Sequence, residues 1–268
     1  MISEEVALAV RAYLSSYLEA DEFAVGKPDN SYAVHSLYLD SDRLATYHAA
    51  LDGQRNRFKL RIRYYDEEWN SPVFFEVKRR INVGVVKQRA RVRREAVKSL
   101  LEGASPQPEH LFKWNDRHWT DLLEFWQLVE KMEAAPRAHN SYLREAYVND
   151  DATVRVTLDR AIQIGPEFRG NLGVAMEDGV EVFGGVVVLE LKFTDRMPTW
   201  LIEMVRGFDL KSTGAAKYVQ GVTLMGEHKV ARRLVGFEWG NAVTSTPTSA
   251  PWLDSSVSVR EALGPSHE

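Results

Sequence analysis

Alternation of charged and apolar side chains is the clearest pattern in the chain, and it recurs in several segments. In residues 56–65 every second position holds a cation, namely Lys59, Arg61 and Arg63. After a polar turn, residues 73–80 repeat the pattern with Glu76 and Lys78 on the polar side. Because neighbouring side chains of a strand point to opposite faces, each segment predicts a strand with one charged and one apolar face.

The same pattern predicts further strands at 31–41, 138–148, 152–160 and 182–193. Their polar positions are Tyr142 and Arg144, then Arg155, Thr157 and Asp159, and finally Glu190 and Lys192. One such strand is most simply half-exposed, with its charged side in water. Four or five strands of the same polarity instead favour a closed barrel, with charged residues inside and apolar residues under helices.

Helical periodicity predicts helices at about 3–19, 41–51, 91–101, 109–135, 195–205 and 214–222. Ser3 is the expected cap of the first, with Glu4 and Glu5 in its first turn. The regularly spaced aromatic and aliphatic residues of 109–135 are expected in the core. Together, these elements predict an α+β fold, an antiparallel sheet or barrel with helices outside.

Charge is distributed unevenly along the 268 residues, whose formal net charge is -4. Residues 55–94 hold 13 Lys/Arg and 4 Asp/Glu, which indicates an anionic partner for this region. Inward cations would repel one another unless acids or a bound polyanion neutralised them. Glutamates among them would hold a divalent metal, since carboxylate oxygens suit Mg²⁺ or Mn²⁺. Nucleic acid is disfavoured, because Tyr64 and Tyr65 form no interleaved stacking platform.

Other chemistries find little support. The chain has no cysteine, which excludes disulfides and thiolate metal sites. It shows no P-loop and no Ser-His-Asp arrangement. A poor signal peptide and the absence of a long apolar run predict a cytoplasmic protein without a transmembrane segment. Residues 240–268, rich in Ser, Thr and Pro, are expected to be a disordered tail.

Six short motifs, in order, resemble those of the VTC (vacuolar transporter chaperone) polyphosphate polymerase domain of the triphosphate tunnel metalloenzyme superfamily. They are SLYLDS, FKLRIRYY, FFEVKRR with VVKQRARV, VRVTLD, LELKF and AAKYVQG. The resemblance covers about residues 1–230 and implies an eight-stranded antiparallel tunnel barrel. It also implies transfer of the ATP γ-phosphoryl group onto inorganic polyphosphate, assisted by Mn²⁺ or Mg²⁺.

The resemblance also assigns roles to individual residues. Those expected to grip phosphate during catalysis are Arg61, Arg63, Lys78, Lys87 and Arg155. The resemblance implies substrate binding by Lys192, Lys211 and Lys217, with Lys211 the weaker match. Lys59, Tyr142 and Arg144 are added as substrate-binding residues because the strand pattern places them on the charged faces. Glu190 corresponds to the family's metal-binding glutamate, and Glu76 is added as a second carboxylate because it lies among the cations.

One departure leaves alternatives open. The family has a first strand with a Glu-x-Lys pair before the helix that begins ISEE, and no such strand precedes this helix in the given sequence, so either the start codon was placed too late or one tunnel wall is absent. A tunnel-family triphosphatase uses the same cations and metal, and a non-catalytic polyphosphate-binding module needs only the cations. The sequence specifies no membrane-protein partner.

Overall fold

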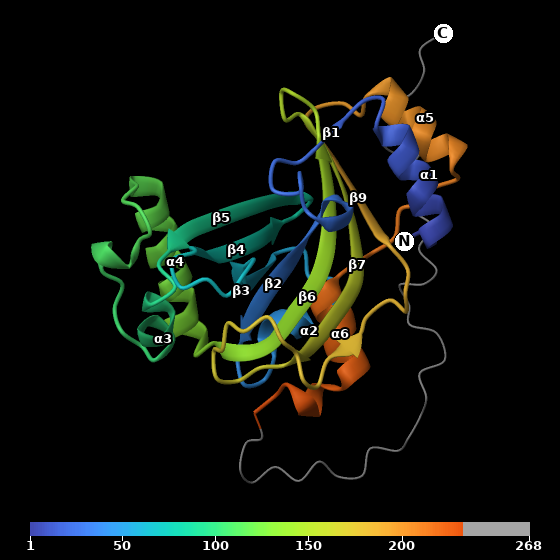
Figure 1. Cartoon of the computed structure of the whole chain (residues 1–268). Coiled ribbons are helices and arrows are strands. Elements are labelled where there is room, and N and C mark those ends of the chain that lie inside the picture. Colours follow the sequence, from blue (N-terminus) through green and yellow to red (C-terminus); the bar gives the residue numbers. More distant parts are fainter. Residues whose placement is uncertain (233–268) are drawn as a thin grey trace, which may run out of the picture.

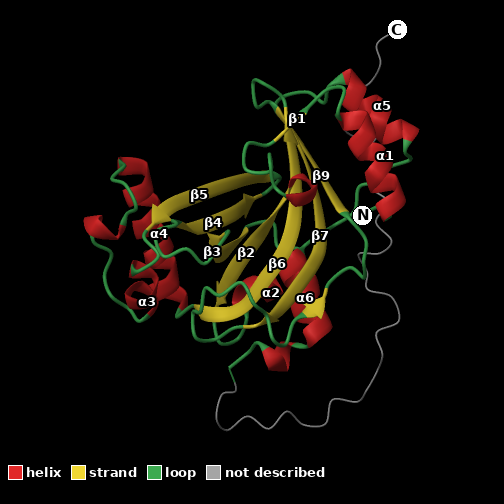
Figure 2. Ribbon diagram, viewed as in Figure 1, coloured by secondary structure: helices red, strands yellow, loops and turns green. Residues whose placement is uncertain are grey.

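A single antiparallel sheet forms the centre of the computed structural model, which describes residues 1–232 (Figures 1 and 2). Its nine strands are β1 (Glu19–Ala20), β2 (Ser31–Asp40), β3 (Arg57–Tyr64), β4 (Val73–Ile81), β5 (Gly84–Val92), β6 (Ala135–Val148), β7 (Val154–Pro166), β8 (Val180–Glu181) and β9 (Val188–Phe193). The order is β5-β4-β3-β2-β6-β7-β8, with β1 added to β6 and β9 to β7. The predicted antiparallel sheet is confirmed.

Helices pack on both faces of this sheet. They are α1 (Glu4–Leu14), α2 (Ala45–Leu51), α3 (Ala96–Leu101), α4 (Asp116–Met132), α5 (Thr199–Gly207) and α6 (Lys217–Met225). Helices α3 and α4 cover the apolar face of β3–β5, and α1 with α5 covers that of β7 and β9. Helices α2 and α6 pack over part of the opposite face. Within residues 1–232 no helix has the length and apolar character needed to cross a bilayer.

The sheet is strongly bent but does not close into a barrel within residues 1–232 (Figure 1). Strand β5 pairs with β4 on one side, and β8 and β9 pair with β7 at the other end. No ladder joins these two ends among the described residues. The closed eight-stranded barrel is therefore not confirmed, whereas the sheet and its covering helices are.

Several boundaries differ from the sequence prediction. The first helix ends at Leu14 rather than near residue 19, and α4 begins at Asp116 rather than at residue 109. Two further differences lie in the sheet. A helix over 91–101 is wrong at its start, because Arg91 and Val92 belong to β5, where Arg91 lies opposite Phe74. The expected strand at 182–193 is two strands, β8 and β9, separated by Gly184 and Gly185. These glycines have φ of +59° and +74°, a left-handed conformation that interrupts a strand.

Strand alternation sets the two faces as the sequence predicts. Leu60 and Ile62 of β3 are fully buried with Phe125 of α4 in one apolar core. The cations between them therefore point to the other, inner face. The predicted tail at 240–268 lies outside the described residues.

Candidate functional site

Cross-strand register assembles one wall of charged side chains on β3, β4 and β5. Arg61 of β3 lies opposite Glu76 of β4, and Lys59 lies opposite Lys78. On the next strand, Arg89 lies opposite Glu76 and Lys87 opposite Lys78. Directly opposed residues of an antiparallel pair point to the same face. Three separate alternating segments therefore contribute to one basic surface, which we call the β3–β5 wall.

Glu76 is the electrostatic centre of this wall. Its side chain is fully buried and lies 2.6 Å from Arg61 Nε, 2.8 Å from Lys87 Nζ and 3.1 Å from Arg89 Nε. Burial alone would raise the pKa of Glu76, but the charges of Arg61, Arg63 and Lys87 hold it well below its usual range. The carboxylate thus stays ionised and keeps the neighbouring cations in place.

Burial and nearby charges change the pKa values of the neighbouring groups. Burial lowers the pKa of Lys59 to about 8 and that of Lys87 to about 8. The pKa of Tyr38 is also lowered to about 8, because Arg61 and Lys59 outweigh the opposing effect of burial. Three side chains of the site therefore titrate close to neutral pH, where a bound anion would favour their positive or neutral forms.

A second wall lies on β6, β7 and β9 and is reached by α6. Arg144 binds Asp159 through two hydrogen bonds of 2.7 and 2.8 Å. Lys217, the first residue of α6, lies 2.8 Å from the same carboxylate. Glu190 lies 3.2 Å from Lys192 and 3.8 Å from Arg144. Burial opposes ionisation of Glu190, yet Lys192 and Arg144 lower its pKa.

Tyr142 connects the two walls. Arg63 of β3 donates a hydrogen bond of 3.2 Å to its hydroxyl. Arg144 and Lys217 lie 5.2 and 4.8 Å from the centre of its ring. One aromatic side chain therefore contacts cations from β3, β6 and α6 on one face of the sheet.

Asp40 at the end of β2 positions the helix that carries Lys217. Its buried carboxylate accepts hydrogen bonds from Thr46 and Tyr47 at the start of α2, and one of 3.0 Å from the hydroxyl of Tyr218. The Tyr218 ring also stacks on Tyr38, with 4.5 Å between ring centres. Both α2 and α6 are thus fixed to the strand whose sequence is SLYLD.

Comparison with protein-family models now adds to this geometry. A model described as the VTC domain matches residues 1–226. The chain belongs to the VTC domain family. Membership indicates a function related to polyphosphate, consistent with two facing walls of Lys and Arg. No curated protein matches the chain.

Most residues that the sequence links to the VTC domain meet in these two walls, whereas Lys211 lies apart and Arg155 lies at the margin of the second wall. Lys211 is 80% exposed and pairs with the equally exposed Asp209 in the segment before α6. Arg155 is on the polar face of β7, opposite Lys192, and binds Asp21 at 2.6 Å. It therefore extends the second wall toward the chain that leads into β2.

The metal implied by the VTC domain was tested against the carboxylates of the site. Residues 1–232 contain no group of three or more His, Asp and Glu side chains that could hold a metal. Glu76 is enclosed by three cations, so its charge is already neutralised. Glu190 is 41% exposed at the edge of the second wall. One carboxylate suffices for a cation such as Mg²⁺ that takes its other ligands from water and substrate phosphates, so Glu190 fits this role better than Glu76.

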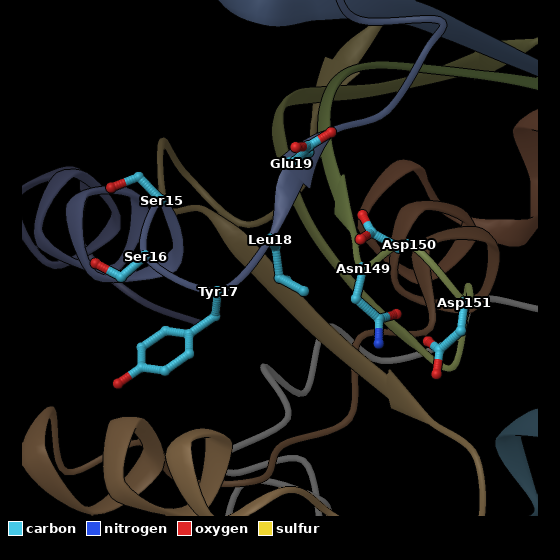
Figure 3. Close-up of a pocket in the computed structure, with 8 residues that line it drawn as sticks. All are labelled: Ser15, Ser16, Tyr17, Leu18, Glu19, Asn149, Asp150 and Asp151. Carbon is cyan, nitrogen blue, oxygen red and sulfur yellow. The ribbon is translucent and has the colours of Figure 1, made fainter.

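A separate hollow of about 530 Å³ lies where the segment after α1 meets the β6–β7 turn (Figure 3). Its polar lining includes Ser15, Ser16, Glu19, Asp150 and Asp151. The close-up shows the two aspartates on one side and the serines on the other. Three carboxylates and no cation in this lining disfavour a phosphate ligand here.

Sequence reasoning missed several residues of the site. Arg89 contacts Glu76 and stacks over the Phe74 ring at 3.7 Å. It belongs to the alternating segment VVKQRARV, and its spacing of two positions from Lys87 places both side chains on the same face of a strand. The pairing of Asp159 with Arg144 was also within reach, since both residues lie on predicted polar faces. The position of Tyr38 beside Arg61 follows from strand register, which the sequence does not give.

Proposed function

We propose that the chain transfers the γ-phosphoryl group of ATP onto an inorganic polyphosphate chain held between the two walls. The observation that carries this proposal is the convergence of cations from β3, β4, β5, β6 and α6 on one face of the bent sheet. A single strand of alternating charges is ordinary, but register-matched cations across several strands form an extended anionic binding surface. Membership of the VTC domain family supports polyphosphate as the anion.

The chain's own residues supply positioning and charge neutralisation, which are the main requirements of phosphoryl transfer. Arg61 is fixed in place by Glu76, so its remaining N–H groups can donate to phosphate oxygens without a large loss of conformational entropy. Lys78 and Lys87 act as point charges beside it. No protein nucleophile is needed, because the end of the phosphate chain attacks.

Glu190 would hold a divalent metal together with oxygens of the substrate. When bound, Mn²⁺ or Mg²⁺ would neutralise charge that develops on the phosphate oxygens. Lys192 and Arg144 keep Glu190 ionised, as its lowered pKa indicates. The same two cations face the substrate, and Lys217 reaches this region from α6.

The proposal includes a tunnel-like path for the polymer. Arg63 of one wall contacts Tyr142 of the other across β2, and we propose that a polyanion lies over this contact with cations of both walls beside it. Enclosure of this kind lowers the local dielectric and strengthens each charge-assisted contact. A closed barrel would surround the polyphosphate with such cations on every side.

The decisive experiment is incubation of the purified protein with ATP and Mn²⁺ or Mg²⁺, followed by gel separation of the products. Polyphosphate that lengthens with time supports the proposal, and orthophosphate released from added tripolyphosphate would instead indicate a triphosphatase. Binding of polyphosphate with neither product would leave a non-catalytic module. Circular dichroism of the same sample shows whether inactivity reflects loss of folding.

A further inference from the structure

The turn between β4 and β5 exposes an unusual group of aliphatic side chains. The exposed fractions are 51% for Ile81, 92% for Val83, 56% for Val85 and 48% for Val86. They follow one another within six positions, so they form one apolar tip, which we call the hairpin tip. Scattered single hydrophobic residues are normal on protein surfaces, but a cluster at the end of a projecting hairpin indicates a contact site.

The hairpin that carries this tip is strongly basic. Residues 77–94 hold eight Lys/Arg and no Asp or Glu. Arg80 lies directly opposite Val85, and Arg57 of β3 lies opposite Arg80. Burial and the neighbouring Arg80 lower the pKa of Arg57, which reflects how closely these cations lie. Apolar side chains therefore end the hairpin, with a belt of positive charge directly behind them.

An apolar tip with positive charge behind it favours some binding partners over others. A second copy of the chain would bring an equally basic hairpin against the first, and the two would repel. An anionic surface with an apolar interior matches both features, since basic residues are attracted to such a surface and apolar side chains insert below the headgroups. We propose that the hairpin tip docks on an anionic phospholipid bilayer, with Val83 inserted and Arg80 at the headgroup level.

The β4–β5 hairpin has the rigid backbone that insertion into a bilayer requires. Nine paired positions join β4 to β5, from Val73–Val92 to Ile81–Gly84, so the tip is held by a continuous ladder. Asn82 at the turn has φ of +53° and accepts a hydrogen bond from Arg80 through its carbonyl oxygen. The turn is therefore preorganised, and docking would order few additional residues. The proposal is independent of phosphoryl transfer.

The test measures flotation of the full chain with two kinds of vesicles, phosphatidylcholine alone and phosphatidylcholine mixed with phosphatidylserine. We expect binding to the mixed vesicles and little to the neutral ones, with raised salt weakening it. Val83→Ser should reduce the equilibrium constant for vesicle binding by about threefold to tenfold, because one exposed valine no longer inserts. Val174→Ser, which removes an exposed valine from another surface, should bind as the unchanged protein does.

Arg80→Gln removes a positive charge rather than an apolar side chain. It should weaken vesicle binding by about fivefold and reduce the salt dependence of binding. Saturating polyphosphate serves as a competitor. If it abolished vesicle binding while Val83→Ser left binding unchanged, the basic walls rather than the tip would hold the lipid and the proposal would fail. Absence of binding to the mixed vesicles by the folded protein would also overturn it. So would a dimer in light scattering that Val83→Ser dissociates.

Discussion

Arg63 donates a hydrogen bond of 3.2 Å to the hydroxyl of Tyr142, although 79 positions separate the two residues in the chain. The strands that carry them are not neighbours, because β2 lies between β3 and β6. The contact therefore shows that side chains of β3 and β6 meet across β2 on one face of the sheet. It also gives the two walls a shared aromatic residue, whose ring lies beside Arg144 and Lys217.

Removing only the hydroxyl of Tyr142 tests this link. Tyr142→Phe keeps the ring and its cation–π contacts but leaves Arg63 without this acceptor. We expect polyphosphate affinity to fall by about threefold to tenfold, the usual effect of losing one hydrogen bond. Tyr142→Leu, which also removes the ring, should weaken binding further. Isothermal titration of both variants checks the order, and equal affinities for Phe and Leu would contradict a role of the ring.

The ion pair of Arg61 with Glu76 determines what happens when Arg61 is removed. Repulsion among cations alone would predict that Arg61→Ala stabilises the empty protein. Because Glu76 is fully buried and Arg61 lies at 2.6 Å, the opposite sign is expected. The free energy of unfolding should fall by about 1–3 kcal/mol, since Lys87 and Arg89 still compensate part of the charge. Denaturant unfolding measures this change.

The same variant should also bind polyphosphate roughly tenfold more weakly, because one charge-assisted contact is lost. Thermal melting with and without polyphosphate separates the two effects, with Lys98→Ala, a change at an 86% exposed lysine, as control. If the ligand raised the melting temperature equally in Arg61→Ala and in the unchanged protein, Arg61 would not touch the polymer.

Binding should depend on pH near neutrality. The pKa of Lys59 and that of Lys87 are each about 8, so both amines lose their protons as pH rises through this value. The pKa of Tyr38 is also about 8, and its ionisation adds a negative charge in the same range. Polyphosphate affinity should therefore decrease between about pH 7 and pH 9. Lys87→Arg should reduce the slope, and an unchanged slope would remove Lys87 from the binding site.

Glu190→Gln tests the assignment of the metal. The variant keeps the shape of the side chain but removes its charge, so activity should fall by at least ~10²-fold. Polyphosphate binding without metal should be kept or slightly strengthened, because one negative charge facing the polymer is gone. Glu124→Gln, on α4 beside Arg79, is a matched control outside the walls. Near-normal activity of Glu190→Gln over a metal titration would refute the assignment.

Strand alternation made much of the fold predictable from sequence. The cations of β3 are placed on one face by their spacing alone, and the structure confirms the predicted β3 and β4 with nearly the expected bounds. The end of β5 was harder, because only three residues separate Val92 from α3 and none of them is Gly, Pro or Asn. Local periodicity cannot decide such boundaries, whereas pairing with β4 does.

Long-range pairing explains what the sequence leaves out. Spacing places Arg61 and Glu76 on polar faces, but only strand register shows that they lie opposite each other. Register also explains why the carboxylate of Glu76 forms ion pairs with three cations. Asp40 ends a predicted strand, yet nothing nearby indicates that it binds Tyr218 at a distance of 178 positions. Contacts of this kind depend on the packing of α2 and α6, which is a property of the whole fold.

The unjoined edges of the sheet bear on how a long polymer reaches its site. A ring of strands admits a chain only by one of its ends, so every molecule must be threaded. Within residues 1–232, β5 and β9 are not bonded to each other, and the sheet imposes no such topological condition. A polyphosphate already many units long could then be laid sideways against the walls at any point along its length, and leave by the same route.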